Sequence, residues 1–287
     1  MMDGCKEGIY LSLRKVITLL WAVVFCLLAL PGIGDAKKAA PQVTADAVLV
    51  LDNANGKVLY EKNADKREYP ASLTKVMTAI LVLEDNNNDR EVQVSPYAGD
   101  TPYSTFAYTG QVVRQFDMLT QMLLLSDNVA AVALAEAVAG NEGNFVRMMN
   151  NRARELGAVS THFVNPHGLT DFNHYTTARD VGLISRYAMQ KPLFRRIVGS
   201  KEIYVNSIYP QGETLLCENT NDLVYNYDGC IGIKTGWTKA AKGCLVAAAR
   251  RNNHEVMVVL MHSDSLESRF TESAQLLDYG FDLLSGH

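Results

Sequence analysis

The sequence is short of the features that mark several classes of protein. Only 5 of its 287 residues are cysteine, and 31 acidic residues slightly outnumber 27 basic ones, for a net charge of -4. Without a strongly basic field, nucleic acid is not expected as a partner. The sequence shows no fixed-period repeat and no low-complexity tract, which excludes solenoids and long disordered tails. What remains is an ordinary globular composition.

The longest apolar run lies near the N-terminus and is too short for a membrane span. Residues 16–30 are apolar except for one threonine, whereas a spanning helix needs about 20 residues. Basic residues precede this run, and Gly34-Asp35-Ala36 places small residues where a signal peptidase cleaves. We predict a signal peptide at residues 1–36, and export to the periplasm, the cell wall or the medium. A membrane is expected as a partner only if this segment stays uncleaved.

Few cysteines are left beyond that segment, namely Cys217, Cys230 and Cys244. An odd number cannot form a fully paired framework within one chain, and the spacing fits no zinc site. Buried thiols are the favoured interpretation. A Cys217–Cys230 disulfide is the alternative in an oxidising compartment.

Three histidines close together in the sequence, His162, His167 and His174, raise the hypothesis of a metallopeptidase. Their spacing is not the i, i+4 pair of a helical zinc site, and no glutamate lies between them. We interpret them as loop histidines and predict no metal site.

Strand patterns at both ends of the chain enclose a helical middle. Strands are predicted at residues 47–51, 57–60, 202–205, 231–235, 244–249 and 256–262, and helices at 72–84, 115–125, 129–139, 144–156, 177–190 and 268–284. This order predicts an α+β fold with one antiparallel sheet, built from residues 45–65 and 200–287 of a single domain at 37–287. Residues 71–198 are expected to form an inserted helical subdomain, with a cleft between the two parts. The last helix is expected to pack on the sheet.

Three short motifs occur in one order: Ser72-Leu-Thr-Lys75, Ser126-Asp127-Asn128 and Lys234-Thr235-Gly236. Each is weak alone, since Ser12-Leu-Arg-Lys15 matches the first pattern inside the signal segment. Together they supply a nucleophile beside an amine, a second hydroxyl, an amide and a second cation. These are the groups needed to open an amide through an acyl-serine.

The first motif places the proposed nucleophile and its base on one helix face. Ser72 lies near the first turn, where the helix dipole favours developing negative charge. Lys75 can take the proton of Ser72 if burial and a nearby cation, for which Lys234 is the candidate, lower its pKa. We therefore expect Lys75, Ser126 and Lys234 to converge on Ser72, with Lys75 and Ser126 within hydrogen-bond reach.

The other two motifs supply groups that bind and relay. The Ser126 hydroxyl can pass a proton to a leaving amine, and Asn128 can hold a substrate amide because it both donates and accepts. Thr235 can donate to a substrate carboxylate, and Gly236 lets a substrate lie close to the strand backbone.

The chain resembles a serine-type D-alanyl-D-alanine carboxypeptidase, a low-molecular-mass penicillin-binding protein. The similar stretches are Pro70-Ala-Ser-Leu-Thr-Lys75, Asn165-Pro-His-Gly-Leu169, Thr176-Thr-Ala-Arg-Asp180 and Gly232-Ile-Lys-Thr-Gly236, within a match from about Ala45 onward. The motif set is that of penicillin-binding proteins and class A β-lactamases. The resemblance implies a β-lactamase-like fold, a peptidoglycan stem peptide as substrate, covalent inhibition by β-lactams, and no metal or organic cofactor.

The resemblance also implies a role for each motif residue. Ser72 would be the acyl-ester nucleophile, Lys75 the proton acceptor and Ser126 the proton relay. Lys234 would bind substrate, and the backbone N–H groups of Ser72 and Trp237 would form the oxyanion hole.

The sequence departs from the family pattern in two places. Relatives often carry glycine where Asp127 stands, and many have a basic residue near Thr220. Recognition of a substrate carboxylate is then expected from Thr235 and Lys234. Larger relatives add a β-rich second domain and an amphipathic C-terminal anchor, and we expect neither in this chain.

Three other functions were weighed against a carboxypeptidase. A DD-endopeptidase that cuts cross-links shares the chemistry and the site. A class A β-lactamase deacylates with a glutamate-activated water, yet no glutamate lies between Gly157 and Lys201. A non-catalytic penicillin-binding sensor is disfavoured because the residues of all three motifs are present.

Overall fold

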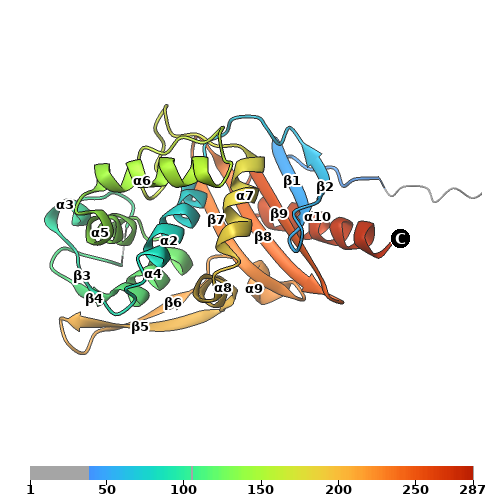
Figure 1. The fold of residues 1–287 in the computed structure, drawn as a ribbon. Coiled ribbons are helices and arrows are strands. Elements are labelled where there is room, and N and C mark those ends of the chain that lie inside the picture. The colour runs from blue at the N-terminus through green and yellow to red at the C-terminus, as the bar shows by residue number, and fades with distance from the viewer. Residues whose placement is uncertain (1–38, 105, 287) are drawn as a thin grey trace, which may run out of the picture. The chain divides into compact units, whose positions relative to one another are not determined.

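Strands from both ends of the chain form the larger of two sheets in a computed structural model, which describes residues 39–104 and 106–286. Its strand order is β2-β1-β9-β8-β7, antiparallel throughout, as Figure 1 shows. These strands are β1 (Ala47–Asp52), β2 (Val58–Lys62), β7 (Cys230–Thr238), β8 (Lys242–Arg251) and β9 (His254–Ser263). The N-terminal hairpin is thus completed by C-terminal strands, as the sequence pattern predicts.

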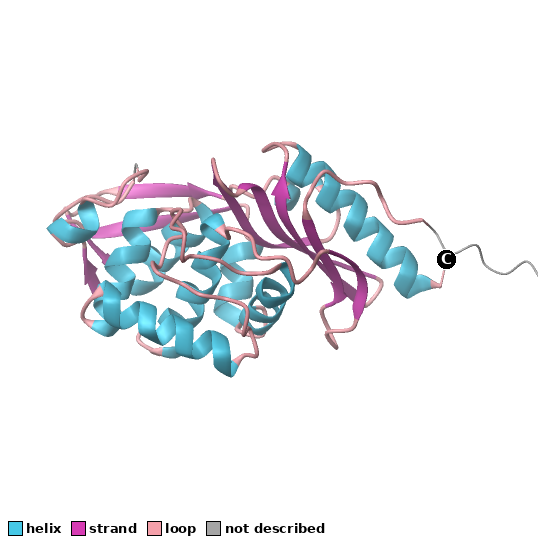
Figure 2. Cartoon of the chain, turned by 90° about the horizontal axis from the view of Figure 1, so that it is seen from above, coloured by secondary structure: helices cyan, strands magenta, loops and turns pink. Residues whose placement is uncertain are grey.

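The middle of each central strand is apolar because both faces of the sheet are covered. All six residues of β1 are buried. Alternate residues point into two separate cores, with Leu49 in the core on the side of the helical region and Val48 in the core under α10 (Ser268–Ser285). In Figure 2, α10 lies along one face of the sheet and the helical region lies on the opposite side. The short helix α9 (Leu223–Asn226) contributes Leu223 to the core under α10. The last helix therefore packs on the sheet, as expected.

The helical region is built around α2 (Lys75–Glu84), whose residues from Lys75 to Leu83 are all buried. A helix that is apolar on every side belongs in the middle of a bundle, and α2 contacts α4, α5, α6 and α7. The helices outside α2 are η1 (Ala71–Thr74, 3-10), α3 (Pro96–Gly99), α4 (Gln115–Leu124), α5 (Asn128–Ala139), α6 (Glu142–Glu155), α7 (Ala178–Ala188), α8 (Pro192–Gly199) and α9 (Leu223–Asn226).

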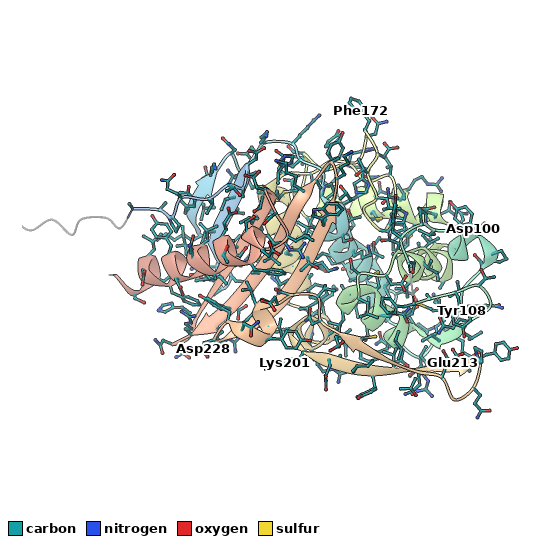
Figure 3. The ribbon with its side chains drawn as sticks, turned by 180° about the vertical axis from the view of Figure 1, so that it is seen from behind. Asp100, Tyr108, Phe172, Lys201, Glu213 and Asp228 are labelled. Carbon is teal, nitrogen blue, oxygen red and sulfur yellow. The ribbon has the colours of Figure 1, made fainter. Side chains whose placement is uncertain are left out.

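A second, smaller sheet edges the helical region, with the order β3-β4-β5-β6. It consists of β3 (Glu91–Gln93), β4 (Val112–Arg114), β5 (Glu202–Tyr209) and β6 (Thr214–Glu218). The prediction of one sheet was wrong here, because residues 202–205, expected in the large sheet, belong to β5 of this second sheet. The strands β3, β4 and β6 were not predicted, and β3 and β4, with three residues each, are too short to show a period. Figure 3 shows Tyr108 and Glu213 at one end of this sheet, where the Tyr108 hydroxyl donates to the Glu213 carboxylate.

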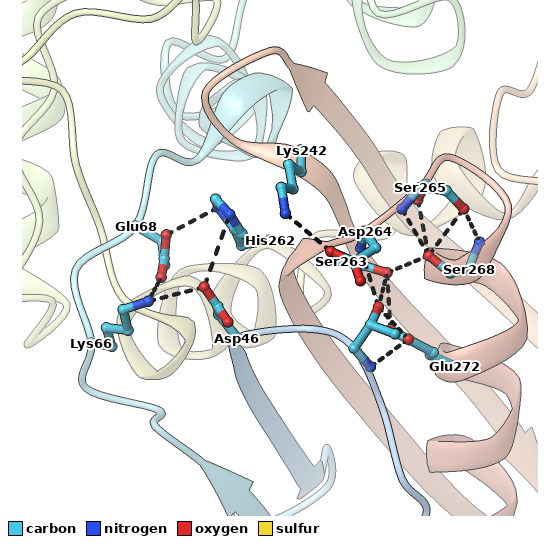
Figure 4. Close-up of polar contacts among 11 residues, drawn as sticks. Asp46, Lys66, Glu68, Lys242, His262, Ser263, Asp264, Ser265, Ser268 and Glu272 are labelled. Atoms are coloured by element: carbon cyan, nitrogen blue, oxygen red, sulfur yellow. Dashed lines mark hydrogen bonds and ion pairs between the residues drawn. The ribbon is translucent and has the colours of Figure 1, made fainter.

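Polar contacts fix the segment that leads to Ser72. The Lys66 amine lies 3.0 Å from the Asp46 carboxylate and 2.7 Å from that of Glu68, as drawn in Figure 4. His262 at the end of β9 faces the same carboxylates. Glu68 also pairs through its backbone with Thr176. These contacts fix Glu68, which lies four residues before Ser72, against the end of β9.

The signal peptide predicted at residues 1–36 lies outside the described residues. Residue contacts divide the chain into residues 1–39 and residues 40–287, and every element named here belongs to the second unit.

Cys217, Cys230 and Cys244 are free thiols, so the alternative disulfide is not formed. No helix within residues 39–104 and 106–286 has the length and apolarity required to cross a bilayer.

Candidate active site

Ser72 lies in the short 3-10 helix η1, immediately before α2. The backbone around it is crowded from two sides. A Cβ atom on Gly168 would lie 1.8 Å from the Ala71 carbonyl oxygen, and one on Gly236 would lie 3.2 Å from the Ser72 nitrogen. The backbone can pass this close to Ser72 at both positions because glycine has no side chain. The loop containing Gly168 and strand β7 therefore meet at the nucleophile.

Lys75 begins α2, and its side chain is fully buried beside Ser72. Its amine donates to the Ser72 hydroxyl oxygen at 3.0 Å, to Asn128 Oδ1 at 2.7 Å and to the His167 carbonyl at 2.7 Å. Burial lowers the pKa of Lys75 to about 7, although the Asp127 charge acts in the opposite direction. Loss of hydration thus makes this amine a base near neutral pH.

Lys234 is the second buried amine of the site and donates to the Thr235 carbonyl at 3.1 Å. Burial lowers the pKa of Lys234 well below its usual range, and the charges of Lys75 and Arg269 lower it further. The sequence predicts that burial and a nearby cation, with Lys234 as the candidate, lower the pKa of Lys75. Burial is the cause for Lys75, whereas the effect of one amine on the other is found at Lys234, whose pKa is lowered by the charge of Lys75.

The Ser126-Asp127-Asn128 motif connects α4 to α5. Asp127 caps α5 by accepting from the Ala130 N–H, and Asn128 reaches the Lys75 amine. Ser126 has a left-handed φ of +62° and lines the same cavity as Ser72. Among the described residues, its hydroxyl makes no hydrogen bond to Lys75, so the expected direct contact between these two side chains is not formed.

Strand β7 supplies the opposite wall of the site. Thr235 Oγ1 lies 2.9 Å from Thr220 Oγ1, so Thr220 contacts the Lys-Thr-Gly motif. Trp237 is 53% exposed and lines the cavity. A Cβ on Gly236 would lie 3.2 Å from the Ser72 nitrogen. The β7 backbone next to Trp237 therefore lies beside the nucleophile.

A cavity of about 840 Å³ lies between the helical region and β7. The residues around it include all the predicted site residues except Lys75 and Lys234, which are buried. The structure therefore brings the three motifs together around one space. It is large enough for a peptide segment.

Sequence reasoning missed Arg269, at the start of α10, which also lines this cavity. Its side chain is buried and donates to the Gly236 carbonyl at 2.9 Å, while its Nε has no hydrogen-bond partner among the described residues. A guanidinium that lines a cavity is suited to bind a carboxylate. A lone arginine in a helix gives no sequence signal, and only the fold places it beside the Lys-Thr-Gly strand.

The loop from Asn165 to Leu169 positions the amine of Lys75 through its backbone. Asn165 Oδ1 accepts from the Gly168 N–H, and the Thr78 hydroxyl donates to the Pro166 carbonyl, which fixes the neighbouring His167 carbonyl. Burial lowers the pKa of His167 to about 3, with the Lys75 and His174 charges adding to the effect. This side chain is therefore neutral at physiological pH.

The three histidines do not share one site. His174 Nε2 lies 2.8 Å from the Thr74 hydroxyl, and burial lowers the pKa of His174 to about 4. His162 Nδ1 lies 2.6 Å from the Asn173 carbonyl, toward the surface. Each ring thus contacts a different part of the loop, which fits a structural role.

The sequence matches known proteins across most of its length. Residues 35–265 match the family described as D-alanyl-D-alanine carboxypeptidase, Peptidase_S11. The chain is 33% identical over 249 residues to D-alanyl-D-alanine carboxypeptidase DacF of Bacillus subtilis, a match that covers 85% of this chain and 64% of that protein. It is 32% identical over 270 residues to D-alanyl-D-alanine endopeptidase of Escherichia coli, covering 91% and 85%.

The fold also matches solved structures. The crystal structure of the Streptomyces K15 DD-transpeptidase aligns with a TM-score of 0.81 at 31% identity, covering 85% of this chain and 99% of that one. This similarity confirms the predicted α+β, β-lactamase-like fold. The chain spans less than two thirds of the length of some curated relatives, 64% for DacF and 63% for DacA of Haemophilus influenzae.

Proposed function

Because the chain belongs to the D-alanyl-D-alanine carboxypeptidase family, we propose that it is a serine-type DD-carboxypeptidase acting on peptidoglycan stem peptides. One observation carries the proposal. A fully buried lysine, its pKa lowered by burial to about 7, lies 3.0 Å from a serine hydroxyl that opens onto a cavity of about 840 Å³. An activated nucleophile with a neutral amine base is what acyl transfer to serine needs.

In the proposed reaction, Ser72 Oγ attacks the carbonyl carbon of the penultimate D-Ala while Lys75 accepts the hydroxyl proton. The backbone N–H groups of Ser72 and Trp237 stabilise the oxyanion, which is supported by the close approach of β7 to the Ser72 nitrogen. The C–N bond then breaks, and the departing D-Ala amine receives the proton. The acyl-serine ester is finally hydrolysed by water, with the Lys75 amine as base.

Other cavity residues are proposed to bind and relay. Ser126 passes the proton to the leaving amine, and its position at the cavity beside Ser72 supports this role. Asn128 orients the Lys75 amine and the donor amide. Thr235 and Arg269, which line the cavity, bind the terminal carboxylate of the substrate. Lys234 was expected to share this role, but it is buried outside the cavity lining and donates to the Thr235 carbonyl, so its proposed role is to hold β7.

A DD-endopeptidase is the second candidate, because the E. coli endopeptidase matches this chain over 91% of its length. Both activities would use the same acyl-serine and differ in the leaving group. We further propose that the protein acts outside the cytoplasm, that β-lactams bind it covalently, and that nucleic acid is not a partner.

Labelled penicillin tests the nucleophile. The purified full chain is expected to carry the label on Ser72 for minutes or longer, as located by peptide mapping. Ser72→Ala should abolish labelling with little change in thermal stability, because it removes only a hydroxyl from a half-buried residue at the cavity. A label on another residue, or its rapid release, would contradict the assignment.

The reaction is tested separately with two substrates, a stem pentapeptide and a cross-linked dimer of stem peptides. Mass spectrometry of the products identifies the bond that is cut. Release of D-Ala from the pentapeptide supports the carboxypeptidase, and cleavage of the dimer alone supports the endopeptidase. Ser72→Ala serves as the control in both reactions.

A further inference from the structure

Tyr103 stands out because its backbone is strained and its side chain is almost fully open. Its φ is +60°, in the left-handed region that bulky residues seldom adopt. Its side chain is 84% exposed and lines the catalytic cavity. Strained residues persist where the surroundings fix them, and they cluster at binding sites.

One amide side chain ties this strained residue to the catalytic amine. Asn128 Nδ2 donates to the Pro102 carbonyl at 3.0 Å and to the Tyr103 carbonyl at 3.4 Å. Asn128 Oδ1 accepts from the Lys75 amine at 2.7 Å. The position of Tyr103 is therefore set by the residue that orients the proposed base.

The neighbouring Asp127 anchors the chain on the other side of Tyr103. Its carboxylate, 2% exposed, accepts hydrogen bonds from the Ser104 hydroxyl and the Ala107 N–H, and also from Gln121 Nε2 within the helical region. Tyr103 is thus held from both directions by adjacent residues of one motif. Such anchoring presents a ring in a fixed place without using the ring itself.

The ring has no role in holding the fold. Among the described residues, the Tyr103 hydroxyl has no hydrogen-bond partner and its ring stacks on no other ring. Trp237 is the other exposed aromatic side chain at the cavity and comes from β7, on the sheet side. Exposed aromatic rings on two walls of one cavity are typical of ligand contacts.

The arrangement of charge indicates which part of a substrate reaches the ring. Arg269 and Thr235 lie on the β7 and α10 side, where they are proposed to take the terminal carboxylate. The chain preceding the scissile bond then extends past Asn128 toward Tyr103. This part of a stem peptide carries the side chain of its third residue, which has an aliphatic stem able to pack on a ring.

We propose that Tyr103 is a specificity-determining residue that packs on the donor segment preceding the scissile bond, and so selects extended stem peptides over minimal ones. The inference rests on the proposed DD-peptidase function. It adds to that function a preference for substrates with a longer peptide before the scissile bond, and this preference is set by the Tyr103 ring.

The test compares two substrates, the pentapeptide L-Ala-γ-D-Glu-L-Lys-D-Ala-D-Ala and the minimal N-acetyl-D-Ala-D-Ala. Tyr103→Ala should lower kcat/KM for the pentapeptide by about 3- to 10-fold, the range of one aromatic contact, and change that of the minimal substrate by less than about 2-fold. Tyr103→Phe should behave like the unmodified chain. Tyr204→Ala removes another exposed tyrosine, on β5, that does not line the cavity, and should leave both values unchanged.

A second variant separates recognition from folding. Tyr103→Gly removes the ring and relieves the left-handed backbone. It should therefore lose the same selectivity as Tyr103→Ala while melting at the same or a higher temperature. An equal loss on both substrates, or an unchanged ratio of the two kcat/KM values, would overturn the inference.

The outcome for the proposed function is read from the unmodified chain. If it releases no D-Ala from either substrate and takes no penicillin label, the proposed function fails and this inference fails with it. If it is active and Tyr103→Ala keeps the substrate ratio, only the role of Tyr103 is rejected.

Discussion

The amine of Lys75 lies 3.0 Å from the hydroxyl oxygen of Ser72, inside a shell that gives it two further acceptors and no water-exposed surface. Both acceptors, the Asn128 carboxamide and the His167 carbonyl, are neutral. The amine therefore has partners for its hydrogens without a carboxylate in contact to hold it charged. This combination keeps a lysine available as a base at neutral pH.

The pH dependence of acylation should follow the titration of Lys75. Because burial lowers the pKa of Lys75 to about 7, the amine becomes neutral, and able to accept a proton, as the pH rises through about 7. The acylation rate by a β-lactam should thus fall about tenfold per pH unit well below pH 7 and level off above pH 8. Stopped-flow rates between pH 5 and 9 measure this. A rate independent of pH across that range would exclude Lys75 as the base.

Replacing the base by another cation gives a second test. Lys75→Arg should be nearly as damaging as Lys75→Ala, with a loss of about 10²–10⁴ in acylation rate, because a guanidinium does not deprotonate in proteins. Lys234→Arg is the control, since Lys234 is proposed to hold β7 by donating to the Thr235 carbonyl, which a guanidinium can also do, and it should retain more activity. Equal tolerance of arginine at both positions would mean that Lys75 is not the base.

Two glycines with similar backbone angles separate close contact from strain. Gly168 has a φ of +94° and no room for a Cβ, which would lie 1.8 Å from the Ala71 carbonyl oxygen, whereas Gly212 has a φ of +89° and open space around it. Gly168→Ala should lower the free energy of unfolding by more than about 3 kcal/mol and abolish penicillin labelling, while Gly212→Ala should cost about 1 kcal/mol. Denaturant unfolding measures both. Similar losses would show that backbone strain alone explains Gly168.

Acid stability should depend on Glu255, which is mostly buried at the start of β9. Burial by itself raises its pKa, but hydrogen bonds from Arg195, Asn53 and Arg250 lower the pKa of Glu255 overall. A lowered folded-state pKa stabilises the protein above the unfolded value of about 4.3, and this stabilisation disappears as the pH falls. Glu255→Gln should therefore destabilise the protein at pH 7 and flatten the loss of stability between pH 5 and 3.

The matched control for this effect is Glu218→Gln, because Glu218 is exposed on β6 and its carboxylate has no hydrogen bond to a described residue. Its curve of melting temperature against pH should follow that of the unmodified chain. If Glu255→Gln also followed that curve, the ion pairs around Glu255 would contribute nothing measurable to folding.

The sequence predicted those elements whose residues are buried on a regular pattern. Strands β8 and β9 are long apolar runs, and the ends of α4 and α5 were placed within one or two residues. The strands β3 and β4 were missed because each has three residues, and their pairing depends on β5, which lies about 90 residues later. Only the folded chain brings these segments together.

The residues of the site also fall into two groups, those that the sequence signals and those that only the fold brings to the site. Ser72, Lys75, Asn128 and Lys234 stand in motifs, so their types and order carried a signal. Arg269 stands in no motif, and the His167 contribution comes from a backbone carbonyl that any residue could supply. The left-handed backbone of Tyr103 also leaves no trace in composition or periodicity.

The pairing of β1 with β9 has a consequence for how the protein reaches its folded state. Ala47 lies opposite Met261, roughly 200 positions later, so the first hairpin has no partner strand until nearly the whole chain is available. Contacts this distant in sequence are slow to form. The backbone contact between Ser72 and Gly236 likewise forms only after β7 has been synthesised and has paired. The nucleophile is thus synthesised early but assembled last, so a chain halted before β7 would carry the serine without its reactivity.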